Sequence, residues 1–110
     1  KFGELYLHGG REAGRQIVPA AWVAESFVPR TQSQRSGQLY GYGWWLAEMA
    51  GHETAFAWGF GGQYIFVVPN LDAVVVATSS AEPGVDRREY RLGLFEMVER
   101  NVIGKIEESR

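Results

Sequence analysis

A glycine-rich segment at residues 57–63 is the part of the sequence best suited to chemistry. It reads Ala-Trp-Gly-Phe-Gly-Gly-Gln and leads into runs of β-branched and aromatic residues at 64–68 and 73–78. Such runs are typical of β-strands, so a glycine-rich backbone is attached to what should be the stiffest part of the fold. Glycines leave backbone amides unshielded, which suits the close approach of a ligand or of a developing negative charge. A bulge at the start of a strand is the alternative interpretation.

The two histidines are further candidates for chemistry. His8 falls in the last turn of an expected helix, where a charged imidazole interacts favourably with the helix dipole. His52 precedes Glu53, which suggests an acid–base pair, but adjacent residues in a turn seldom face the same atom. The histidines lie far apart in the sequence without the paired spacing of metal ligands, so a metal site that combines them with nearby carboxylates has little support.

Antiparallel strands are expected on both sides of the glycine-rich segment. Apolar runs bounded by turn-forming residues predict strands at residues 42–47, from 56–58, at 63–68 and at 73–78. The turns between them are predicted at 49–54 and at 69–72, the second being a hairpin connection with Pro, Asn and Asp. The polar segment 31–39 shows no periodicity and is expected to be a loop.

Three helices are expected around these strands. Residues 1–7 carry apolar side chains at helical spacing, and Gly9-Gly10 would end that helix. A second short helix is expected at 20–27, and a long helix that begins at Asp86 would lie on the sheet. Its buried stripe is expected to contain Leu92, Phe95, Val98 (or Glu99 on the flank), Val102 and Ile106.

The apolar residues also indicate how the sheet is covered. Trp44 and Trp45 would point to opposite faces of an extended strand, so they suit a core on one side and a lobe interface on the other, not one stacking platform. The valines at 74–76 predict a central antiparallel strand that is covered by helices on one face and by a second lobe on the other. Without that lobe, exposed apolar area would favour self-association into a homo-oligomer.

The composition limits the class of protein. A length of 110 residues gives one domain at most, which is small for an enzyme with two lobes and a cleft. The 11 basic and 13 acidic residues are interspersed and give a net charge of -2, so no nucleic acid and no membrane partner is expected. No apolar run approaches the ~20 residues of a membrane span. The lack of cysteine excludes disulfides and thiolate metal sites.

Four parts of the chain, in this order, carry a resemblance: 1–10 with 15–23, 40–45, 57–69 and 71–76. Together they resemble the last third of serine β-lactamase-related hydrolases. The group meant is the broad one of class C-like β-lactamases, family VIII-type esterases and 6-aminohexanoate-dimer hydrolases. The resemblance covers nearly the whole chain, and the shared order makes the combination more specific than any single part.

The resemblance implies an acyl-enzyme mechanism whose catalytic groups are only partly in this chain. In the family a Ser-x-x-Lys helix provides the nucleophile and a lysine, and a separate loop provides a tyrosine. None of the serines here is followed by a lysine three residues later, and the lysines are Lys1 and Lys105. We therefore expect a fragment that is inactive alone, uses no cofactor, and has the N-terminal part of its own longer chain as a partner.

The glycine-rich segment corresponds by position to the family's strand that closes the cleft and carries Lys-Thr-Gly. That triplet matches Ala57-Trp58-Gly59, and the family's oxyanion amide falls on the next residue, Phe60. The resemblance thus makes the backbone N–H of Phe60 the catalytic donor to the oxyanion. The residues expected to bind the substrate beside it are Ala57, Trp58, Gly59, Gly61, Gly62 and Gln63.

Departures from the family bear on the substrate. Ala57 and Trp58 replace the lysine and threonine that hold a β-lactam carboxylate, which puts penicillin-type recognition in doubt. An indole beside the oxyanion site suits an uncharged or apolar acyl group, so an ester or a small amide is the expected substrate. Packing under the sheet is the alternative role for Trp58. In the family, loops such as 31–39 border the entrance, so either Gln34 or Arg35 contacts the substrate or the segment is a plain surface connector.

The expected fold is therefore α+β, an antiparallel sheet flanked by helices. By resemblance, residues 1–110 form an incomplete C-terminal portion of the α/β lobe of a β-lactamase/transpeptidase-like fold. The alternative function is that of a non-catalytic relative or of an aromatic-lined ligand-binding module that uses Trp44, Trp45 and Trp58. Neither a cytoplasmic nor a periplasmic location is favoured.

Overall fold

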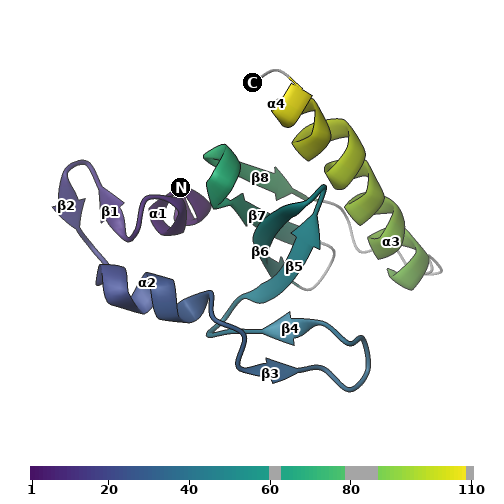
Figure 1. Cartoon of the computed structure of the whole chain (residues 1–110), viewed down its shortest axis with the longest axis horizontal. Coiled ribbons are helices and arrows are strands. Elements are labelled where there is room, and N and C mark those ends of the chain that lie inside the picture. The colour runs from purple at the N-terminus through teal and green to yellow at the C-terminus, as the bar shows by residue number, and fades with distance from the viewer. Residues whose placement is uncertain (60–62, 79–86, 109–110) are drawn as a thin grey trace.

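The computed structural model describes residues 1–59, 63–78 and 87–108. It confirms the expected α+β class, with an antiparallel sheet flanked by helices (Figure 1). The helices are α1 (Phe2–Leu7), α2 (Ala20–Ser26), α3 (Arg87–Met97), the π-helical η2 (Val98–Ile103) and α4 (Gly104–Glu108), with a 3-10 turn at Pro69–Leu71. The strands are β1 (Arg11–Glu12), β2 (Arg15–Gln16), β3 (Thr31–Gln32), β4 (Leu39–Tyr40), β5 (Trp45–Met49), β6 (His52–Gly59), β7 (Gln63–Val68) and β8 (Ala73–Ala77).

The main sheet follows the order of the chain. Its strands are arranged β3-β4-β5-β6-β7-β8, with every neighbouring pair antiparallel, and β1 pairs with β2 as a separate hairpin. Strand β7 has the predicted bounds, and β8 begins at the predicted residue. The predicted hairpin connection at 69–72 is also confirmed, as a 3-10 turn that ends with Asp72 in the left-handed conformation.

Two segments that were expected to be irregular contain strands instead. Strand β3 and the start of β4 lie within the expected loop 31–39, and residues 52–54 of the expected turn belong to β6. The turn between β5 and β6 needs only Ala50 and Gly51, both with positive φ, at 52° and 82°. Two-residue turns of this kind match the twist of the flanking strands, so the pairing continues up to the turn.

The two faces of the sheet carry separate apolar clusters. Trp44 packs with Ala55 and Val67 on the face that α1 covers, whereas Trp45 packs against the cluster on the α3 face. The predicted opposite orientation of the two indoles is therefore confirmed. Figure 1 shows α3 and α4 on one side of the sheet and α1 and α2 on the other.

The buried stripe of the C-terminal helix differs from the predicted one. Leu92 is 57% exposed, whereas Leu94 is buried, and Ile103 is fully buried in place of the expected Val102. The π-helical segment η2, whose turns contain more residues, explains the shift from Val102 to Ile103. Leu92 lies before this segment, in α3, where Leu94 and Phe95 face the sheet and Leu92 does not. Phe95, which was predicted correctly, contacts three rings of the sheet at 5.0 to 5.5 Å, those of Phe56, Tyr64 and Phe66.

Strand β8 does not have the central place that its valines suggested. In the described part of the chain it pairs with β7 alone, so it is an edge strand. Val75 contributes to the α3 face, but Val76 is 62% exposed. The valines of β8 are apolar because Val75 faces α3 on one side of the sheet, whereas α1 partly covers the other side. There Gly3 of α1 lies directly against Val74.

Candidate functional site

The end of strand β6 extends past its neighbour on one side. Strand β5 pairs with β6 only from His52 to Phe56, while residues 57–59 pair on their other edge with 63–65 of β7. Within the described residues, no strand therefore pairs with the β5 side of residues 57–59. An unpaired strand edge presents backbone donors and acceptors that an extended ligand can use.

Alternation along β6 places Trp58 on the α3 face, next to Phe56. The Trp58 indole is 49% exposed and stacks on the ring of its cross-strand partner Tyr64, with 6.1 Å between ring centroids and 10° between planes. The guanidinium of Arg91 lies over the same indole, 5.0 Å from the ring centroid. Trp58 thus combines packing on one face with exposure beside a positive charge.

A small recess of about 20 Å³ opens beside Trp58. Its walls come from β5 and β6, from α3 and from the tip of the β3–β4 hairpin. They comprise Ser36, Gln38, Trp45, Phe56, Trp58, Arg91 and Phe95. The segment for which either substrate contacts or a plain surface connection was suggested therefore reaches the candidate site, through Ser36 and Gln38 rather than through the suggested Gln34 or Arg35.

The recess holds a serine without the means to activate it. Ser36 Oγ accepts a hydrogen bond from the Gln38 N–H at 3.3 Å, and no histidine or lysine is among the described residues that line the recess. A serine nucleophile needs a neighbouring base to take its proton. The recess can therefore bind a small group but does not supply the nucleophile.

The electrostatics of the site are set by burial and by Arg91. Burial raises the pKa of the Tyr64 hydroxyl, the positive charge of Arg91 opposes that rise, and Tyr90 adds to it. The charge of Arg91 therefore acts on the tyrosine whose ring stacks on Trp58.

The residues predicted to form the site fall into two groups. Phe60, Gly61 and Gly62 lie outside the described residues, so the proposed oxyanion donor and two expected substrate contacts are not described. Ala57, Trp58 and Gly59 form the end of β6 that no described strand pairs with on the β5 side, and Gln63 of β7 pairs with Gly59. A Cβ built on Gly59 would lie 3.4 Å from Gln63 Oε1, so the Gln63 carboxamide lies close to this glycine.

The other chemical candidates are not brought together. His8 is the exposed C-cap of α1, and His52 and Glu53 are successive residues of β6, so their side chains point to opposite faces. The acid–base pair is therefore disfavoured by the strand itself, not by a turn. Within the described ranges, no group of three or more His, Asp or Glu residues is placed to hold a metal ion.

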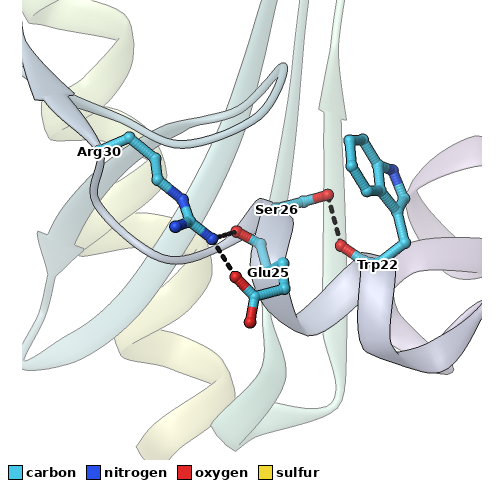
Figure 2. A network of polar contacts seen from close by, with 4 residues as sticks. All are labelled: Trp22, Glu25, Ser26 and Arg30. Carbon is cyan, nitrogen blue, oxygen red and sulfur yellow. Dashed lines mark hydrogen bonds and ion pairs between the residues drawn. The ribbon is translucent and has the colours of Figure 1, made fainter.

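Hydrogen bonds at the end of α2 fix the segment that leads from this helix to the β3–β4 hairpin. Figure 2 shows Arg30 donating to the carboxylate of Glu25 and to its backbone carbonyl, the latter at 3.0 Å, while Ser26 Oγ donates to the Trp22 carbonyl at 2.7 Å. The Arg30 side chain thus binds a carbonyl of the last helical turn, and the Ser26 hydroxyl bonds back to the carbonyl one turn earlier. The network directs the chain from α2 into β3, and so positions the hairpin whose tip lines the recess.

A larger groove of about 290 Å³ lies away from the predicted site. It runs between the end of α2 and strands β4 to β6, with Phe27, Leu39 and Leu46 among its apolar lining. None of the residues predicted to bind the substrate or the oxyanion lines it, although Glu53 of the suggested acid–base pair does, so its size alone does not make it the candidate site.

Arg91, Ser36 and Gln38 were not among the predicted site residues. The signal for Arg91 was present, because it lies one helical turn before Phe95 and hence on the face turned to the sheet. Ser36 and Gln38 gave no such signal, because hairpin β3–β4 consists of two-residue strands without a detectable period.

None of the helices in the described ranges combines the length and the apolar character needed to cross a bilayer.

Comparisons with known proteins add no family assignment. No protein-family model matches the chain, and no curated protein matches it either.

Proposed function

We propose that this chain is the C-terminal part of a β-lactamase-related serine hydrolase that acts on esters or small amides through an acyl-enzyme. The observation that carries the proposal is the end of β6, where residues 57–59 begin the glycine-rich segment and pair with no described strand on their β5 side. An acyl group placed along that edge would meet backbone amides as its carbonyl becomes an oxyanion. The finer fold that goes with this function is the β-lactamase/transpeptidase-like one.

In this proposal the backbone N–H of Phe60 donates to the oxyanion. A donor of this kind contributes roughly 3 kcal/mol to transition-state stabilisation. The residues beside it, 57–59 and 61–63, contact the substrate. The nucleophile and its base come from a preceding part of a longer protein, which is why the chain alone is inactive.

The experiment compares the longer protein with the 110-residue chain in hydrolysis of p-nitrophenyl butyrate. We expect turnover by the longer protein and none by the chain. Phe60→Pro removes the N–H and should lower kcat by about 100-fold, whereas Phe60→Ala keeps the N–H and should retain most of the activity. Circular dichroism checks that both variants fold. Equal activity of the two variants would contradict the oxyanion role, and a folded longer protein that hydrolyses nothing would contradict the function.

The second candidate is a non-catalytic relative or an aromatic-lined ligand-binding module. The observation that favours it is the shared lining of one recess by Trp45 and Trp58. Trp44, however, is buried in the cluster on the other face and cannot join them. The same assay separates the two functions, because this module would bind small ligands without turnover in any length of the chain.

A further inference from the structure

The groove between the end of α2 and strands β4 to β6, here named the α2 groove, has an apolar floor. Leu39 of β4, Leu46 of β5 and Ala55 of β6 lie side by side across the sheet, since Leu46 pairs with both of the others. Phe27 and Pro29, from the end of α2 and the segment after it, also line the groove. Its volume of about 290 Å³ is enough for a large apolar side chain.

One end of the α2 groove is acidic. Glu48 and Glu53 line it there, are directly opposite each other in the β5–β6 ladder, and are both exposed. Opposite residues point to the same face of a sheet, and like charges in such a pair destabilise it. A cation bound between the two carboxylates would remove this repulsion. Arg30, which follows Pro29 of the lining, does not serve this purpose, because it already binds Glu25.

The apolar floor and the acidic end are two residues apart along each strand. Leu46 and Glu48 of β5 point to the same face because side chains alternate along a strand, and so do Ala55 and Glu53 of β6. Two residues of an extended strand span about 7 Å. An extended peptide has the same repeat. An apolar and a basic side chain with one residue between them would therefore reach the floor and the carboxylates together.

The exposure of the lining favours a peptide segment over a small molecule. Leu39 is 40% exposed, and Val28, between Phe27 and Pro29, is 42% exposed. Pockets for small molecules bury most of the ligand surface, whereas the apolar surface here continues beyond the groove. An apolar anchor beside an arginine is typical of the residues that contribute most to protein–protein binding.

We propose that the α2 groove docks an extended segment of a partner protein in which an apolar residue and an arginine or lysine are separated by one residue. The apolar side chain covers Leu39, Leu46 and Ala55, and the basic side chain binds the carboxylates of Glu48 and Glu53. Arginine suits this place best, because its planar guanidinium donates several hydrogen bonds to carboxylates at once. The surface is apart from the candidate active site, and the inference does not rest on the proposed function.

The test measures peptide binding to the ¹⁵N-labelled 110-residue chain by NMR, from the backbone amide signals of Leu46 and Ala55. The probe is acetyl-Thr-Phe-Thr-Arg-Thr-amide, whose threonines favour an extended backbone. One comparison peptide has glutamate in place of arginine. The other, acetyl-Thr-Phe-Arg-Thr-Thr-amide, has the two side chains adjacent and therefore on opposite faces. We expect saturable shifts with the probe and about tenfold weaker binding of both comparison peptides.

Substitution of the two glutamates tests the acidic end. The double variant Glu48→Gln/Glu53→Gln should weaken probe binding by about tenfold and abolish the discrimination against the glutamate peptide. Because the glutamates repel each other, this change should not destabilise the fold. The matched control is Glu4→Gln/Glu12→Gln, which removes the same charge from exposed positions of α1 and β1 and should leave binding unchanged.

Equal binding of the three peptides, or equal loss in the two double variants, would overturn the docking site. The same titration of the longer protein tests the source of the segment. Binding there as well supports a partner protein, whereas no binding would mean that the preceding part of the chain itself fills the groove, which would overturn the proposal. A fall in the mass of the self-associated chain when the probe is added, measured by light scattering, would assign the groove to a second copy and overturn it too.

Discussion

Tyr64 on strand β7 connects the chemistry of the site to the stability of the fold. Its side chain is 2% exposed, and burial raises the pKa of its hydroxyl, with Arg91 opposing the rise and Tyr90 adding to it. Because the folded-state pKa exceeds the unfolded value of about 10, the folded protein holds this proton more tightly. The stabilisation is complete below about pH 10 and is lost as the pH rises through the folded-state pKa.

The corresponding prediction concerns Tyr64→Phe, which cannot ionise. Its free energy of unfolding, from urea denaturation between about pH 8 and about pH 11, should fall less steeply at the alkaline end than that of the unchanged protein. The control Tyr42→Phe removes a hydroxyl from an exposed ring and should keep the steeper fall. An identical pH dependence of the free energy of unfolding in all three proteins would show that ionisation of Tyr64 does not cause the loss of stability at alkaline pH.

Glu99 is a second residue whose role depends on distant parts of the chain. Its Oε2 accepts a hydrogen bond from the Ala50 N–H at 2.7 Å, at a turn where Ala50 has a positive φ of 52°. Glu99→Ala leaves a partly buried N–H without a partner, so we expect a loss of about 2 kcal/mol in the free energy of unfolding. Glu99→Gln keeps an acceptor and should lose less than half of that.

The control for this prediction is Glu96→Ala on the same helical stretch. Glu96 pairs with Arg100 on the surface, and both side chains are more than half exposed, so its loss should change the free energy of unfolding by no more than about 0.5 kcal/mol. Chemical denaturation of all three variants measures the difference. A Glu99→Ala variant as stable as Glu96→Ala would mean that the turn does not need this acceptor.

Single-residue features were predictable from the sequence where a short-range rule applies. The opposite orientation of Trp44 and Trp45 follows from the period of a strand and was predicted correctly. The position of Arg91 over Trp58 depends on how α3 crosses the sheet, and no local pattern encodes that crossing. The catalytic assignment to Phe60 lies outside the described residues and stays a prediction.

Among the elements, the C-terminal helix provides the clearest test. The apolar stripe predicted from the sequence would bury Leu92, but the structure exposes 57% of it and leaves 9% of Leu94 exposed. The same substitution at both positions therefore separates the two geometries. Leu94→Ala should lower the free energy of unfolding by about 3 kcal/mol, whereas Leu92→Ala should lower it by no more than about 0.5 kcal/mol. The reverse order, measured by chemical denaturation, would support the helix phase that the sequence alone suggested.

Elements were predicted well where the chain carries a long, regular pattern. Strand β7 and the connection to β8 were predicted from apolar runs and turn formers. Strands β3 and β4 were missed because two residues cannot show a period, and the start of β6 was missed because His52, Glu53 and Thr54 are polar. The π-helical η2 was missed because the predicted stripe assumed a constant number of residues per turn.

At the scale of the whole molecule, the order of strands could not be read from the sequence. Three valines in β8 suggested a central strand, but centrality depends on pairing between distant segments. In the described part of the chain, β8 pairs with β7 alone, whereas the other edge strand, β3, has two residues and carries polar side chains. Edge strands usually carry charges, proline or bulges that prevent pairing with another chain, and the sequence of β8, Ala-Val-Val-Val-Ala, has none of these residues.

The edge of β8 predicts self-association of the isolated chain. Antiparallel pairing of two copies would place Ala73 opposite Ala77 and Val75 opposite itself, so the strand is complementary to its own copy. We expect light scattering coupled to size-exclusion chromatography to show a mass that rises with protein concentration. Val76→Lys places a charge on this exposed edge position and should weaken association by about tenfold. Val28→Lys, the control at an exposed valine outside the sheet, should not weaken association. A chain that stays monomeric at every concentration would mean that the β8 edge does not pair with a second copy.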